Sequence, residues 1–149
     1  MRLIAITGMR HDAKVRLIQS LIASINLQDA SLTLLDNGDE PLKLDAITRQ
    51  RLAGGCVCCS LAAALIPIVW RLETDYALLL VSASADPETL ARLLDSWQGT
   101  QVEVRTLALI DAYTHAHFPY LAQRLGFYAT HPCHEPFDFA EVADAALRI

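Results

Sequence analysis

The sequence predicts an α/β domain in which a mostly parallel sheet lies between two layers of helices. Short, continuous apolar runs alternate along the chain with segments of helical periodicity. These runs are nearly continuous rather than alternating, as is typical of parallel strands that are buried on both faces. The chain has 149 residues, 53% of them apolar and 19% charged, which fits a single domain with a well-filled core.

The first predicted elements are a strand, a loop and a helix. Residues 3–7 form an apolar run that ends at a glycine, and apolar side chains recur at helical spacing over residues 15–25. A second strand is expected at residues 32–35, because the turn-forming residues 36–39 end the apolar run there. We expect an irregular segment from that turn to Gly55.

The middle of the chain continues the alternation. Residues 61–72 are rich in alanine and leucine and predict a helix, which Pro67 should end or kink just before that residue. Residues 76–81 predict a further buried strand. The Asp-Pro pair at residues 86–87 then has the form of a helix start, and this helix should run to about Trp97.

The last part of the chain has a weaker pattern. Residues 102–110 contain a fourth predicted strand, followed by Asp111 at its carboxyl end. This aspartate is either a carboxylate on the magnesium side of a site or a helix cap. We expect proline-containing loops around Pro119 and residues 132–136, and then a closing helix over residues 139–147.

Composition and charge exclude several classes of partner. The net charge is -5, and the positive charges comprise only two lysines and ten scattered arginines, so a nucleic-acid binder is not expected. No stretch stays apolar and uncharged for the roughly 20 residues that a membrane span requires. The first apolar run is also too short for a signal peptide, which predicts a cytoplasmic protein.

The turn after the first strand partly matches the phosphate-binding motif G-x-x-x-x-G-K-S/T. Gly8 and Lys14 occupy the first glycine and the lysine positions, but Ala13 and Val15 replace the second glycine and the magnesium-binding hydroxyl. Asp12 adds a negative charge where phosphate oxygens would lie. Gly8 and Lys14 are therefore weak candidates for cofactor binding, no catalytic residue is expected, and the alternative is an ordinary turn from strand to helix.

A cluster of cysteines is the clearest chemical feature. Two glycines at residues 54–55 precede Cys56, Cys58 and Cys59, and glycine gives the backbone freedom to turn the three thiols towards one point. Thiolates are soft ligands for zinc, cobalt or copper(I), so the spacing predicts a transition-metal site with an open fourth position. Redox or disulfide chemistry and an inert buried cluster are the alternatives.

Five further residues could complete that site: His115, His117, His131, Cys133 and His134. Histidine is the commonest metal ligand, so either group could supply a fourth ligand. Neither group has a standard zinc-finger spacing to the cysteines, which favours histidines at the surface or at helix ends. The group at residues 131–134 is the better candidate of the two.

Several segments together resemble the CobW-type P-loop GTPases and metallochaperones, in a shortened and degenerate form. Residues 37–40 look like the family's N-x-x-G-E segment, and residues 55–59 match its G-C-I/V-C-C motif. Asp86-Pro87 and residues 110–112 look like its D-P and V-D-A segments. The resemblance covers residues 1–118, without the guanine-reading N-K-x-D sequence and the carboxyl-terminal domain.

The resemblance implies a P-loop GTPase-like fold that binds zinc or cobalt but lacks competent GTP hydrolysis. The expected role is metal binding or assistance to a metallochaperone, with zinc as the expected cofactor and little support for a nucleotide. Its partner would be a client metalloprotein, an intact GTPase relative, or a second copy of the chain that completes the open coordination position. Two alternatives stay open: a weak or partner-activated NTPase that uses Lys14, and an interaction scaffold with unligated cysteines.

Overall fold

The protein is described by a computed structural model at residues 1–42, 44, 47–58 and 60–148. Within these residues the strands form one parallel sheet in the order β3-β2-β4-β1-β5-β6. The strands are β1 (Arg2–Gly8), β2 (Leu32–Asp36), β3 (Thr48–Arg51), β4 (Tyr76–Leu80), β5 (Glu103–Ile110) and β6 (His131–His134). The predicted α/β class with a mostly parallel sheet is confirmed.

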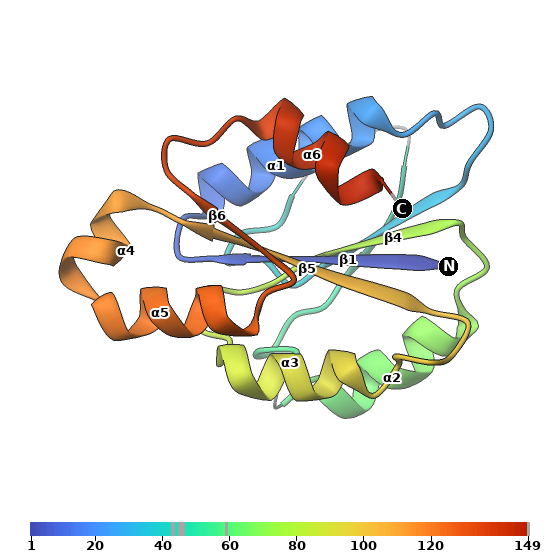
Figure 1. Ribbon diagram of the computed structural model, residues 1–149. Coiled ribbons are helices and arrows are strands. Elements are labelled where there is room, and N and C mark those ends of the chain that lie inside the picture. Colours follow the sequence, from blue (N-terminus) through green and yellow to red (C-terminus); the bar gives the residue numbers. More distant parts are fainter. Residues whose placement is uncertain (43, 45–46, 59, 149) are drawn as a thin grey trace.

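Helices cover both faces of the sheet (Figure 1). One face carries α1 (His11–Ser24) and α6 (Phe139–Leu147), and the other carries α2 (Ala62–Arg71), α3 (Pro87–Asp95) and α5 (Pro119–Tyr128). The short helix α4 (Ala112–His117) follows the carboxyl end of β5. Among the described residues no helix is long and apolar enough to cross a membrane.

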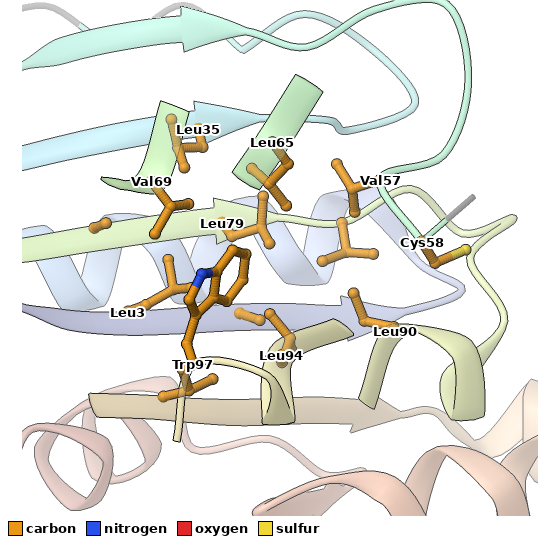
Figure 2. Packing of buried hydrophobic residues seen from close by; sticks show 14 of the residues in the cluster. Leu3, Leu35, Val57, Cys58, Leu65, Val69, Leu79, Leu90, Leu94 and Trp97 are labelled. Atoms are coloured by element: carbon orange, nitrogen blue, oxygen red, sulfur yellow. The ribbon is translucent and has the colours of Figure 1, made fainter. Parts of the chain in front are cut away.

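The burial of β1 explains why residues 3–6 of this strand are all apolar. Leu3 and Ala5 pack towards α2 and α3, whereas Ile4 and Ile6 pack towards α1 and α6. Figure 2 shows the first of these two layers, in which Leu65 and Val69 of α2 and Leu90 and Leu94 of α3 surround Trp97 and the sheet. Two-sided burial therefore replaces the alternating pattern of a half-exposed strand.

Both edge strands lie in segments where the sequence predicted loops. β3 falls in the segment expected to be irregular, and β6 falls in the proline-containing loop around Pro132. Neither strand has an apolar run, because each pairs on one side only and most of its residues are exposed or half-buried. These segments are strands because their backbones hydrogen-bond to β2 and β5.

Two segments that contain proline differ from the sequence prediction. Of the two alternatives for Pro67, an end of the helix is wrong, because α2 continues through this residue. The proline ring leaves the Ala63 carbonyl without its helical donor, but Ala63 is exposed and water can satisfy that group, while Leu65 and Val69 anchor the helix to the sheet. The loop expected around Pro119 is also helical, since Pro119 occupies the first turn of α5, where no amide donor is needed.

Candidate functional site

The candidate residues gather at the carboxyl ends of β1, β2 and β4, the edge at which parallel sheets bind ligands. β1 ends at Gly8, β2 leads into Asn37, and β4 leads into Val81 and Ser82. Lys14 of α1, the connections after β2 and β4, and the cysteine loop (residues 54–58 as described) are joined by hydrogen bonds and an ion pair between residues far apart in the sequence.

The turn after β1 is much tighter than the motif spacing suggested. Helix α1 begins at His11, so only Met9 and Arg10 separate strand from helix, and the Lys14 amide already donates to the Arg10 carbonyl. The cavity beside Gly8 has a volume of about 10 Å³, room for about one water molecule. Because α1 begins three residues after Gly8, the turn lacks the longer glycine-containing loop whose backbone amides wrap a phosphate in a P-loop.

The conformation and close packing of the backbone at position 8 explain why this residue is glycine. Its φ is +142°, and a β-carbon at this position would lie 2.5 Å from the Leu109 carbonyl oxygen in β5. We expect Gly8→Ala to lower the free energy of unfolding by about 1–3 kcal/mol, because strained backbone and overpacking each cost that order. Chemical denaturation would measure it.

Gly99→Ala is the matched control for Gly8→Ala. Gly99 also has a positive φ, +78°, but nothing lies within 4 Å of an added β-carbon. It should therefore show the cost of the backbone conformation without the clash, and its loss of stability should be the smaller. Equal losses for the two variants would contradict the close approach of β1 to β5.

Lys14 is fully enclosed by the protein, with 0% of its surface exposed. Its Nζ donates to the Val81 carbonyl oxygen at 2.7 Å and lies 3.6 Å from Asp39 Oδ2. Burial lowers the pKa of Lys14, while the Asp39 carboxylate opposes that shift. The anion beside the Lys14 ammonium is thus a carboxylate of the same chain.

Asp39 is held in place by the loop that follows β4. Its Oδ1 accepts hydrogen bonds from Ser82 Oγ at 3.0 Å and from the Ala83 amide at 3.2 Å. Partial burial raises the pKa of Asp39, but the Lys14 charge and these hydrogen bonds outweigh it, so the pKa lies below its ordinary value of 3.8. Asp39, in the turn after β2, is therefore linked to α1 through Lys14. It is linked to the loop after β4 through its hydrogen bonds to Ser82 and Ala83.

Asp36, at the end of β2, organises the next turn. It is fully buried, and its carboxylate accepts from the Gly38 amide at 3.0 Å and the Leu42 amide at 2.8 Å. Arg51 of β3 forms an ion pair with it at 3.0 Å. The buried charge is thus paired and hydrogen-bonded, as a stable fold requires.

Asn37 connects this turn to the cysteine loop. Its Nδ2 donates to the carbonyl oxygens of Leu52 at 2.9 Å and Gly55 at 2.8 Å, and its Oδ1 accepts from the Val57 amide at 3.2 Å. All three partners are backbone groups. The Asn37 side chain therefore satisfies backbone donors and acceptors that have no partner within a helix or strand. Through Gly55 and Val57, Asn37 fixes the backbone on both sides of Cys56.

The structure brings Cys56 and Cys58 together. Each is 6% exposed, they are joined by a disulfide, and their Cα atoms are 5.4 Å apart. Gly54 and Gly55 both have positive φ, which confirms the backbone freedom expected of them. Cys59, the third predicted ligand, lies outside the described residues, so metal ligation by Cys56, Cys58 and Cys59 remains a prediction.

The cysteine loop is also held by the hydrophobic core. Val57, between the two cysteines, is fully buried against Leu65 and Leu79 of the core cluster, and Cys58 lies at the edge of that cluster (Figure 2). Leu61, just before α2, donates its amide to the Cys56 carbonyl. The loop is therefore positioned by the core on one side and by Asn37 on the other.

The remaining candidates lie on α4 and β6. His115 Nε2 is 2.8 Å from His134 Nδ1, whereas the His117 ring stacks on Tyr113. Burial raises the pKa of the Cys133 thiol. Across the described residues no group of three or more His, Cys, Asp or Glu side chains is arranged to hold a metal ion.

Asp111 lies at the start of α4, where the alternatives were a site carboxylate and a helix cap. It is almost fully buried, and its Oδ1 accepts a hydrogen bond from the Thr114 hydroxyl instead of a backbone amide. Asp111 therefore stabilises the first turn of α4 through a side chain.

Sequence reasoning missed three of the groups that organise the site: Asp36, Arg51 and the role of Asp39. The available signal was a run of Asp and Asn residues at the end of an apolar strand, which was interpreted as a turn. Buried charges in proteins are paired with opposite charges. Once Asp36 and Lys14 are known to be buried, this rule predicts ion pairs such as Asp36–Arg51 and Lys14–Asp39.

Comparison with known proteins supports the fold. The chain matches the solution NMR structure of a de novo designed protein with a P-loop NTPase fold, with a TM-score of 0.53 and 11% identity, over 97% of this chain and 88% of that one. It also matches the crystal structure of the Zn(II)-bound YjiA GTPase from E. coli, with a TM-score of 0.58 and 17% identity, over 97% of this chain.

The chain spans about half the length of YjiA, 52% of that protein. No protein-family model and no curated protein matches the sequence. At these identities the likeness concerns the fold. The chain therefore has an α/β fold like that of P-loop NTPases, with the YjiA GTPase among its structural neighbours.

Proposed function

We propose that this protein binds a transition-metal ion, zinc or cobalt, through the thiolates of Cys56, Cys58 and Cys59, and does not hydrolyse GTP. The observation that carries the proposal is the pairing of the Cys56 and Cys58 sulfurs on a loop that Asn37 and the core hold in place. The Zn(II)-bound state of the YjiA neighbour supports the choice of metal.

The donor set suits such an ion once the disulfide is reduced. Zinc–thiolate bonds are about 2.3 Å long, so two sulfurs on one tetrahedral ion lie about 3.8 Å apart. Cys56 and Cys58 need only separate locally to reach that spacing, and the two preceding glycines permit this movement. Cys59 supplies the third thiolate in this proposal, and the metal is cargo that a partner can reach through the open position.

Three features support the absence of hydrolysis. Val15 has no hydroxyl for magnesium, the turn before α1 consists of two residues, and the Lys14 ammonium is engaged by Val81 and Asp39. A nucleotide would have to displace Asp39 before it could reach Lys14. The partner in a delivery role is a client metalloprotein, an intact GTPase relative or a second copy of this chain, in a reducing compartment such as the cytoplasm.

Metal uptake by reduced protein tests the proposal. Wild type should take up zinc, and with cobalt it should show thiolate-to-metal charge-transfer absorption, whereas Cys56→Ser/Cys58→Ser/Cys59→Ser should take up less zinc and lose that absorption because the soft ligands are gone. Equilibrium dialysis followed by elemental analysis measures the uptake. Cys133→Ser is the matched control, because this half-buried thiol lies on β6 outside the loop.

Equal uptake by wild type and the triple variant would sink the metal proposal. Loss of uptake in Cys133→Ser would place the site elsewhere. A comparison of reduced with oxidised wild type adds a second readout, since the disulfide form should take up less metal than the dithiol form.

The Cys56–Cys58 disulfide favours a second candidate function, thiol–disulfide exchange. In that reaction the disulfide accepts two electrons and two protons and becomes two thiols, while an external dithiol loses them and becomes a disulfide. Titration in glutathione buffers distinguishes the two functions. Reversible cycling without metal uptake by the reduced protein would replace the first proposal with this one.

A further inference from the structure

His115 and His134 form a contact that the cysteine loop does not explain. His115 lies on α4 and His134 at the end of β6, and both side chains are exposed. Their facing nitrogens, Nε2 of His115 and Nδ1 of His134, are 2.8 Å apart, and the ring planes are inclined by 32°. Residues 19 apart in the sequence are thus brought together at the surface.

The backbone that carries the two rings is held by other contacts. Glu135, next to His134, accepts from the Ala112 amide at 2.8 Å and from Arg10 Nη1 at 3.3 Å. Its own amide donates to the Ile110 carbonyl at 3.2 Å. Because Glu135 already ties the first residue of α4 to the end of β6, the histidine contact is not needed to join these elements.

The spacing of the two nitrogens is that of ligands on one metal ion. Imidazole nitrogens lie about 2.0–2.1 Å from a divalent transition metal, so two of them at a right angle are about 2.8–3.0 Å apart. The facing nitrogens can therefore share an ion once each ring turns its lone pair away from the other nitrogen and towards a point beside the line that joins them. In the metal-free pair one facing nitrogen carries a proton.

Binding would leave the proton count of the neutral pair unchanged. Both facing nitrogens bind the metal through their lone pairs, and each ring keeps one proton on its outer nitrogen, Nδ1 of His115 and Nε2 of His134. The proton of the bridging hydrogen bond thus moves from a facing to an outer position of the same ring through solvent exchange.

We propose that His115 and His134 bind a borderline divalent ion of the nickel, copper and zinc class at a site separate from the cysteine loop. Imidazole suits these ions, and the net charge of -5 favours cations. Within the described residues no third His, Cys, Asp or Glu joins the pair. The other coordination positions go to water or to a group from a bound molecule, so the ion exchanges readily.

Nickel is the probe for the test, applied to the reduced protein. Paramagnetic Ni²⁺ should first broaden the imidazole NMR signals of His115 and His134, while His11, His117 and His131 remain sharp. By calorimetry, His115→Gln and His134→Gln should each weaken Ni²⁺ binding by about 10- to 100-fold, the range that loss of one supporting group already causes at metal sites.

His117→Gln is the matched control, because His117 is exposed on the same helix and faces Tyr113 instead of His134. It should leave Ni²⁺ binding unchanged. Circular dichroism verifies that each variant is folded. Broadening confined to the residues around Cys56, equal effects of all three glutamine variants, or unchanged affinity in His134→Gln would each overturn the proposal.

Discussion

Asp39→Asn should lower the free energy of unfolding by about 2–4 kcal/mol at neutral pH. The variant leaves the Lys14 ammonium fully buried without its counter-charge. Breaking a fully buried ion pair costs about 3–5 kcal/mol, and the effect here is smaller because the Asp39 side chain is 37% exposed and partly screened. Urea denaturation measures the difference from wild type.

Lys14→Met is the matched variant for Asp39→Asn. It removes the buried charge at similar volume but leaves the Val81 carbonyl without its donor, so we expect it to lose about 1–2 kcal/mol, less than Asp39→Asn. Asp39→Asn on this background should then cost little, which makes the pair strongly non-additive. A Lys14→Met variant less stable than Asp39→Asn would show that the cost does not come from an unpaired ammonium.

The two members of this pair also predict the direction of pH effects. Because the pKa of Asp39 lies below its ordinary value of 3.8, the ionised carboxylate stabilises the fold above that value. That stability is lost as the pH falls through the folded pKa, so wild type should approach Asp39→Asn in acid. Because the pKa of Lys14 lies below its ordinary value of 10.5, deprotonation on the alkaline side relieves the cost of burying the charge.

Asn37→Ala should cost a comparable amount, about 2–4 kcal/mol. The substitution leaves the carbonyl oxygens of Leu52 and Gly55 and the amide of Val57 without their hydrogen bonds. Each buried polar group left unpaired costs about 1–3 kcal/mol, reduced where water can enter the loop. In reduced protein the loss of loop geometry should also weaken cobalt binding, measured by its charge-transfer absorption.

Asn26→Ala is the control for Asn37→Ala. Asn26 is exposed and its side chain contacts only its own turn, through Gln28 and Asp29, so its replacement should be nearly neutral. Asn37→Asp keeps the acceptor for Val57 but turns a carboxylate oxygen towards two carbonyls, and it should be as damaging as alanine. A stable Asn37→Asp variant with normal cobalt absorption would show that the hydrogen bonds of Asn37 do not hold the cysteine loop in place.

The strands of the core could be predicted because burial acts on each residue directly. Residues 3–6 and 76–81 are apolar at every position, and both segments lie in the centre of the sheet. The edge strands β3 and β6 could not be predicted in this way, since their identity depends on hydrogen bonds to β2 and β5 and not on their own composition.

The sequence by itself determined the α/β class, the central apolar strands and the cluster of cysteines behind two glycines. These are local patterns, because a strand buried on both faces or a pair of adjacent thiols is visible within a few residues. Only the tertiary structure decided that Lys14 pairs with Asp39, that Asn37 holds the cysteine loop, and that His115 meets His134. Each of these contacts joins residues 18 or more apart, and the physical reason is the parallel topology, which gathers the carboxyl ends of separate strands at one edge of the sheet.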